Sequence, residues 1–252
     1  MESFFTFLNT GALLGWSIVL TILILHQQTP LSTSTINEWV DPFFDVSSDG
    51  RIPLIDLLFF LEALCCFEVT RIAIGQLKGN LILGIVLHMI RITCLLLVLP
   101  NGLTSSITSG DDNGYNNHMY NNPKFFTSIL VLYSWSLTEV GRYPMYLFPK
   151  SNIARNVRLV LPMITFPIGC AAEAYGAYTV LIELLTISDD GNNSDNASEG
   201  SMLYWVKIAS LCMVLLINGL LGPTLAYPAL LKKGMKVVMG NKSKKQKEKK
   251  DA

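Results

Sequence analysis

Charged residues are scarce in this sequence. Only 15% of its 252 residues are Asp, Glu, Lys or Arg, whereas half are hydrophobic and the mean hydropathy is +0.40. A soluble domain usually carries about 25% charged residues. The deficit excludes an ordinary soluble domain and predicts an all-α polytopic membrane protein.

A basic surface for nucleic acid is also missing. The formal net charge is zero, and nine of the 19 Lys and Arg residues lie in a tail, 232–252, that contains no aromatic residue. A nucleic-acid-binding domain combines a clustered basic face with residues that stack on bases. We therefore predict no nucleic-acid partner, and we treat 232–252 as a basic cytosolic tail.

The sequence lacks a cysteine framework. All five cysteines lie in apolar segments, and their spacing matches neither a disulfide scaffold nor a zinc motif. We expect them to pack as small hydrophobic residues, and no metal or redox cofactor is implied. The N-terminus has no basic n-region and no small-residue cleavage site, so its apolar stretch is predicted to be a retained anchor.

Long apolar runs are what the sequence has instead. Spanning a bilayer takes about 20 mainly apolar residues. Six segments meet this length, and together they predict a six-helix membrane domain over residues 1–231: 4–26, 53–74, 79–99, 125–148, 156–186 and 203–231. The fifth contains Pro162 and Pro167, which predict a kink because proline removes a backbone donor.

Lysine and arginine alternate between the connections. The connections after the second and fourth segments and the C-terminal tail are basic, whereas 27–52, 100–123 and 187–202 are mainly acidic. The positive-inside rule then places both termini in the cytosol and those three acidic loops in the lumen. Two glycosylation sequons, at Asn192 and Asn196, lie in a predicted lumenal loop.

The chain ends in Lys249-Lys250-Asp251-Ala252. Lysines at the third and fourth positions from a cytosolic C-terminus resemble the dilysine retrieval signal of endoplasmic reticulum membrane proteins. The competing interpretation is a polybasic tail attracted to anionic lipid headgroups.

The stretch YSWSLTEVGRYPMY carries polar groups into an apolar segment. Glu139, Arg142, Tyr143 and Tyr146 stand at i, i+3, i+4 and i+7, which is one face of a helix. Ionisable groups inside a membrane are costly unless they face protein or a cavity. Two interpretations remain open: a Glu139–Arg142 pair that holds helices together, or the polar wall of a substrate pocket.

Other ionisable residues receive a mainly structural interpretation. Glu62 and Glu68 are expected to pair with Arg71 or Arg91, and His88 is expected to be a satisfied core residue. One predicted cytosolic turn contains Lys150, Arg155 and Arg158. They are either solvated residues that follow the positive-inside rule or residues that bind the phosphates of a substrate.

Several short motifs carry a family pattern across nearly the whole chain. They are NTGALLGW with Asn9, Gly15 and Trp16, LEALCC with Cys65 where a histidine is usual, LHMIRI with Arg91, SLTEVGRYPMY, and RLVLPMITFPIGCAAE with Arg158, Pro167, Gly169 and Glu173. In these motifs the chain resembles the very-long-chain 3-hydroxyacyl-CoA dehydratases, also called protein-tyrosine-phosphatase-like proteins.

The resemblance implies a lyase of the endoplasmic reticulum membrane. Its reaction would be dehydration of 3-hydroxyacyl-CoA to trans-2-enoyl-CoA in fatty acid elongation, alongside other elongation enzymes. The family's catalytic pair is a tyrosine and a glutamate. Glu173 matches the glutamate, whereas Phe166 stands in the tyrosine's place and has no proton to give.

Dehydration needs a base near C2, an acid near the C3 hydroxyl and a donor for the thioester oxygen. A buried Glu173 suits the proton transfer, with Glu139, Arg142, Tyr143, Tyr146 and Arg158 as substrate-binding or supporting residues. We expect Glu139, Arg142, Tyr143 and Glu173 to face one enclosed space between the fourth and fifth segments.

The substitution at Phe166 leaves three interpretations open. Another hydroxyl replaces the missing one, with Tyr143, Tyr146 and Tyr175 as candidates; Glu173 alone sustains slower turnover; or the chain is a non-catalytic scaffold in the elongation assembly. A small-molecule transporter is less favoured, because no inverted repeat and no matching pair of broken helices is visible.

Overall fold

The computed structural model describes residues 2–28, 40, 42–44, 47, 51–76, 80–104, 122–189 and 199–235, and within these ranges every regular element is a helix. The six predicted segments are all helical, each within a few residues of its expected limits. Their elements in chain order are α1 (Glu2–Gln28), α3 (Pro53–Ala73), α4 (Leu81–Thr93) with η2 (Cys94–Val98) and α5 (Leu99–Thr104), α6 (Pro123–Leu147), α7 (Asn152–Val160) with α8 (Pro162–Asp189), and α9 (Glu199–Val214) with η3 (Leu215–Ala226).

Four of the helical stretches are long and apolar enough to cross a membrane. They are Ser3–Gln27, Leu81–Thr104, Asn152–Thr186 and Met202–Met235. The other two long helices, α3 and α6, are not among these four stretches, and both carry buried charged residues, such as Glu62 and Glu139. The all-helical membrane class is thus supported, and a count of six spans stays a prediction.

Local signals fix where several helices begin. Pro53 and Pro123 stand in the first turns of α3 and α6, where the missing N–H costs nothing. Asn80, Asn122 and Ser151 cap α4, α6 and α7, because each side-chain oxygen accepts a bond from a free backbone N–H of the first turn.

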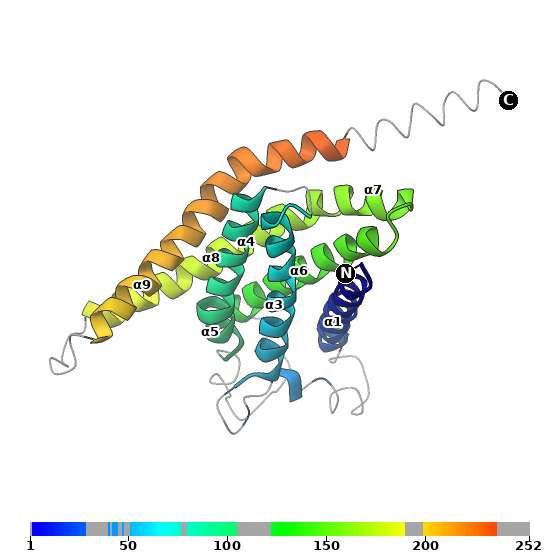
Figure 1. Cartoon of the computed structure of the whole chain (residues 1–252). Coiled ribbons are helices and arrows are strands. Elements are labelled where there is room, and N and C mark those ends of the chain that lie inside the picture. The colour runs from blue at the N-terminus through cyan, green and yellow to red at the C-terminus, as the bar shows by residue number, and fades with distance from the viewer. Residues whose placement is uncertain are drawn as a thin grey trace.

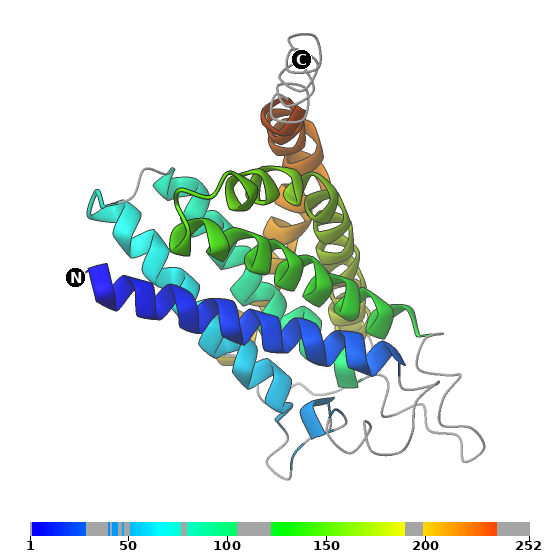
Figure 2. The same cartoon turned by 90° about the vertical axis from the view of Figure 1, so that its right-hand side faces the viewer.

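The predicted bend of the fifth segment is confirmed. The α-helical pattern breaks at Leu161, directly before Pro162, and α7 and α8 run in different directions (Figure 2). Leu161 keeps helical backbone angles, but Pro162 has no backbone N–H, so the next hydrogen bond of the helix cannot form there. Pro167 lies inside α8 without ending it.

Helix α6 packs against α1, α5, α7 and α8. Glycines bring α8 close to its neighbours: a Cβ on Gly169 would lie 2.3 Å from Ser134 Oγ, and one on Gly176 would lie 2.5 Å from Val98 Cγ1. Small residues at such contacts let helix backbones approach closely. The contact at Gly169 faces α6, and this α6–α8 contact positions the residues of the candidate site.

The helix ends sort into two groups. The end of α3, the start of α4, helix α7 and the end of the last helix lie toward the top of Figure 1, whereas the start of α3 and the end of α5 lie toward the bottom. This arrangement is compatible with the predicted alternation of basic and acidic connections. The two sequons, at Asn192 and Asn196, lie outside the described residues. The same holds for the predicted retrieval signal, Lys249 and Lys250.

Candidate active site

An ion-pair network lies between α3, α4 and α6, with Glu139 at its centre. The Glu139 side chain is fully buried, and its two oxygens lie 2.6 Å from Arg91 Nη2 and 2.6 Å from Arg142 Nη2. The predicted i, i+3 pair of Glu139 and Arg142 is therefore confirmed. Each buried charge meets an opposite charge, as an apolar surrounding requires.

The network continues onto α3 and α4. Arg142 Nη2 lies 3.0 Å from Glu68 Oε2, and Arg91 Nη1 lies 3.4 Å from Glu62 Oε2. Glu62 also pairs with His88 Nδ1. The expected Glu62–Arg91 pair is present, as is a partner for His88, whereas Glu68 pairs with Arg142 rather than with the expected arginines.

Tyr143 belongs to this network, and it also lines a small cavity together with Glu68 and Arg71. Its ring is 1% exposed, and its hydroxyl lies 3.2 Å from Cys65 Sγ and accepts a bond from Arg142 Nη2 at 3.3 Å. Tyr146 lies one turn further along α6, under the guanidinium of Arg158, whose Cζ is 5.1 Å from the ring centroid. Arg158 is thereby tied to the end of α6.

Glu173 on α8 forms a second polar group. Trp135 Nε1 donates to Glu173 Oε1 at 2.5 Å, and Asn218 Nδ2 donates to Glu173 Oε2 at 2.5 Å. The three side chains are between 3% and 8% exposed. Both carboxylate oxygens therefore have a donor in a nearly dry interior, which is how a buried carboxylate is stabilised.

Trp135 connects the two groups. Its ring lies beneath Arg91, with the guanidinium carbon 5.3 Å from the ring centroid, while its N–H contacts Glu173. Trp135, Glu139 and Tyr143 recur every four residues and so form one stripe along α6. This spacing lets a single helix support both groups.

Asn218 reaches Glu173 from the last helix. It lies in η3, a π-helical stretch that includes Pro223, and its Oδ1 accepts a weak bond from Cys170 Sγ at 3.7 Å. Wide π-helical turns recur at functional sites, because they redirect side chains. The sequence did carry a signal for this residue, since an amide isolated in the run LLINGLL needs a buried partner.

Phe166 packs at the same α8–η3 contact. Its ring stacks on Tyr227 with centroids 6.5 Å apart and an interplanar angle of 8°, and its tip lies beside Gly222. Tyr175, one of the hydroxyls considered as a substitute, is 47% exposed on the outer side of α8. Tyr227 was not considered from the sequence, because it lies some 60 residues away in the chain.

The expected single space is not what forms. Glu139, Arg142 and Tyr143 turn toward α3 and α4, where Glu68, Cys65 and Arg91 meet them, whereas Glu173 turns toward Trp135 and Asn218. The reason is charge: Arg91 on α4 and Glu68 on α3 offer stronger partners than α8 does. Two cavities among the described residues, one beside Glu68 and Tyr143 and one beside Glu62 and Cys66, are not lined by Glu173.

The sequence matches one family model, that of the protein tyrosine phosphatase-like protein PTPLA, over residues 62–239. The match covers most of the chain. The chain belongs to the PTPLA family. This is the family of very-long-chain 3-hydroxyacyl-CoA dehydratases, so the resemblance seen in the sequence motifs is confirmed.

The PTPLA match begins at Glu62 and ends beyond the last helix, so it takes in both polar groups. The Asn9, Gly15 and Trp16 motif lies before it. No curated protein and no solved structure matches this PTPLA chain. The activity of the chain must therefore be argued from its own residues together with the family.

Proposed function

We propose that this chain is a lyase that dehydrates very-long-chain 3-hydroxyacyl-CoA to trans-2-enoyl-CoA in fatty acid elongation, with Glu173 as its catalytic residue. The observation that carries the proposal is the buried Glu173 carboxylate, held at 2.5 Å by donors on two other helices. Membership of the PTPLA family supplies the reaction class.

Glu173 would act first as a base. Trp135 and Asn218 donate to the two carboxylate oxygens and so fix the position of the group, whose ionised form would accept a proton from C2 of the acyl chain. The electron pair left at C2 forms the double bond to C3, and the C3 hydroxyl departs with a proton as water. If Glu173 returns the C2 proton to that hydroxyl, it is regenerated within the same turnover.

The missing tyrosine hydroxyl needs a substitute, and Tyr227 is the candidate that the packing favours. Its ring is stacked on Phe166, the position of the family tyrosine. The hydroxyl of Tyr143 already meets Cys65 and Arg142, and Tyr175 lies on the outer face. Tyr227 would approach the C3 hydroxyl from the last helix instead of from α8.

The CoA end of the substrate would lie near α7. Arg158 lies beside Tyr146 and forms no ion pair with an acidic side chain of the described residues. Lys150 and Arg155 are exposed in the same region. Guanidinium groups suit the CoA phosphates. The supporting residues Glu139, Arg142 and Tyr143 would then hold α6 in place instead of touching the acyl chain.

Phe166→Tyr is expected to raise turnover about tenfold. A positioned acid or base is typically worth 10²- to 10⁴-fold; we expect less because Tyr227 already presents a hydroxyl next to this position. Dehydratase activity of purified wild-type and variant chains is measured on 3-hydroxyacyl-CoA of several chain lengths. The role of the Tyr227 hydroxyl is tested in the same assay with Tyr227→Phe. Tyr178→Phe is its control, because Tyr178 carries an exposed hydroxyl on α8.

A non-catalytic scaffold is the second candidate function, and Phe166 is the observation that favours it. The same assay separates the two. An inert wild-type chain that gains activity with Phe166→Tyr would mean that the chain has lost its catalytic hydroxyl, and the scaffold interpretation would replace the lyase.

We further propose six spans with both termini in the cytosol and 27–52, 100–123 and 187–202 in the lumen. The alternation of basic and acidic connections supports this topology. A cysteine introduced at residue 192 should react with a membrane-impermeant reagent only from the lumenal side. Labelling of that cysteine from the cytosol would overturn the proposed orientation.

The endoplasmic reticulum is the proposed location, with Lys249 and Lys250 as the retrieval signal. Replacing both by serine is expected to send part of the protein to later compartments, as seen by fluorescence microscopy. Replacing Lys244 and Lys245 is the matched control, since it removes the same charge elsewhere in the tail. Equal localisation of the two double variants would remove the support for retrieval by this signal.

A further inference from the structure

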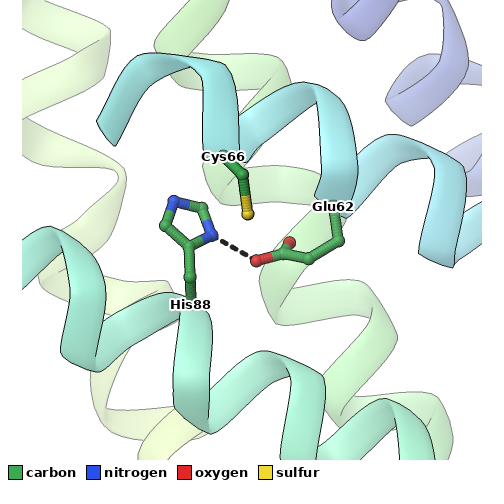
Figure 3. Close-up of side chains that lie close together, drawn as sticks. All are labelled: Glu62, Cys66 and His88. Atoms are coloured by element: carbon green, nitrogen blue, oxygen red, sulfur yellow. Dashed lines mark hydrogen bonds and ion pairs between the residues drawn. The ribbon is translucent and has the colours of Figure 1, made fainter. Parts of the chain in front are cut away.

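Three metal-ligating side chains meet at the outer edge of the ion-pair network, away from Glu173. Glu62 and Cys66 stand four residues apart on one face of α3, and His88 faces them from α4 (Figure 3). One donor atom from each lies within 4.8 Å of the other two. We propose that Glu62, Cys66 and His88 bind a divalent transition-metal ion, Zn²⁺ above all.

The donor set suits zinc. Thiolate, imidazole and carboxylate are its usual protein ligands, whereas Mg²⁺ and Ca²⁺ prefer oxygen alone. Zinc bonds of about 2.0–2.3 Å at tetrahedral angles put neighbouring donors roughly 3.3–3.6 Å apart. The observed group needs side-chain shifts of about 1 Å to reach that geometry, which rotation about side-chain bonds provides.

Among the carboxylates of the network, Glu62 has the longest contact with an arginine. Arg91 lies 2.6 Å from Glu139 but 3.4 Å from Glu62, so its charge is matched mainly by Glu139. The weaker contact still holds Glu62 Oε2 and leaves Oε1 directed at His88. An outer partner that orients a ligand in this way is typical of metal sites.

A cavity of about 440 Å³ gives access to the group. Glu62 and Cys66 line it, together with Thr70 and apolar residues such as Phe59 and Ile92. A metal ion held by three protein ligands keeps a fourth position for water or another small ligand, and this position would face the cavity. The cavity therefore supplies both an entry path and room for the fourth ligand.

Binding changes charge in a balanced way. The Cys66 thiol releases its proton to water, and His88 exchanges the proton on Nδ1 for one on Nε2 through solvent, so that it binds as neutral imidazole. The thiolate and the Glu62 carboxylate together then neutralise the 2+ charge. The ion would then connect α3 to α4 through metal–ligand bonds, in addition to the contact of Arg91 with Glu62. The predicted consequence is a zinc-dependent gain in thermal stability, since a ligand that binds only the folded state stabilises it.

No motif in the sequence indicated this site. Zinc motifs are recognised by closely spaced pairs of cysteine and histidine, whereas here the ligands come from two helices and His88 follows Cys66 by 22 positions. The absence of such a spacing predicted no metal, and the inference rests on the meeting of α3 with α4.

The test uses the purified full chain in detergent, stripped with a chelator and titrated with Co²⁺, whose thiolate complex absorbs in the near ultraviolet. We expect about one ion per chain, displacement of the band by Zn²⁺, and a rise in Tm with Zn²⁺. Cys66→Ser should abolish the thiolate band, and His88→Asn should weaken binding by more than about 100-fold, beyond the 10- to 100-fold typical of an outer partner.

Cys212→Ser is the matched control, because Cys212 is an exposed thiol on α9. It should bind Co²⁺ as the wild type does, and helix content by circular dichroism should be equal in all variants. A wild type that binds no Co²⁺, or a band that survives Cys66→Ser, would overturn the proposal. Because the readout is metal binding, the result is independent of dehydratase activity.

Discussion

Glu173→Gln is expected to lower the turnover of 3-hydroxyacyl-CoA by roughly 10²- to 10⁴-fold, the usual contribution of a positioned acid–base group. The amide has nearly the size of the carboxylate but cannot exchange the C2 proton. Trp135 Nε1 keeps an acceptor if the amide oxygen faces it, whereas the amide NH₂ meets the Asn218 donor. Initial rates of enoyl-CoA formation measure the effect.

Glu183→Gln provides the matched control for this substitution. Glu183 lies on the same helix, ten residues further on, where it pairs with Lys124 and accepts a bond from Asn101. Its side chain is 35% exposed, so loss of the charge is readily hydrated. We expect the Glu183→Gln rate to stay near that of the wild type. An active wild type whose rate is unchanged by Glu173→Gln would place the chemistry elsewhere.

Glu139→Ala is expected to cost about 3–5 kcal/mol of folding stability, the range found when one partner of a buried ion pair is removed. Glu139 is fully buried and faces both Arg91 and Arg142 at 2.6 Å, so its loss leaves two guanidinium groups short of a counter-charge. Unfolding in mixed micelles by added denaturing detergent gives the change in free energy.

Two further variants make this prediction sharp. Glu183→Ala removes a carboxylate from a partly exposed pair and should cost less than about 1 kcal/mol. If Glu139→Ala does not fold, Glu139→Gln keeps the shape and an acceptor, and we expect it to fold with a smaller loss. A Glu139→Ala chain as stable as Glu183→Ala would show that the network does not hold the helices together.

The sequence predicted the helices well because their causes are local. Runs such as Leu81–Thr104 are apolar over the length that a bilayer requires, and Pro162 and Pro53 mark a bend and a start by their own chemistry. The i, i+3 pairing of Glu139 with Arg142 follows from helix geometry alone. Such features need no knowledge of the neighbouring helices.

The partners across helices could not be predicted in the same way. Glu173 was a candidate from its motif, yet its donors Trp135 and Asn218 lie 38 and 45 residues away. Glu68 pairs with Arg142 instead of Arg71. The cluster of Glu62, Cys66 and His88 forms only because α3 and α4 lie side by side. These contacts depend on helix rotation, which residue spacing within one helix does not determine.

The most direct test of Glu173 as the acid–base residue follows deuterium into C2. Purified chain is incubated with trans-2-enoyl-CoA in D₂O, so that the reverse reaction, hydration, makes 3-hydroxyacyl-CoA, and mass spectrometry locates the label. The proposed chemistry predicts one deuterium at C2 with the wild type and essentially no labelled product with Glu173→Gln. Equal labelling by the two chains, or no labelled product from a folded wild type at any chain length, would contradict it.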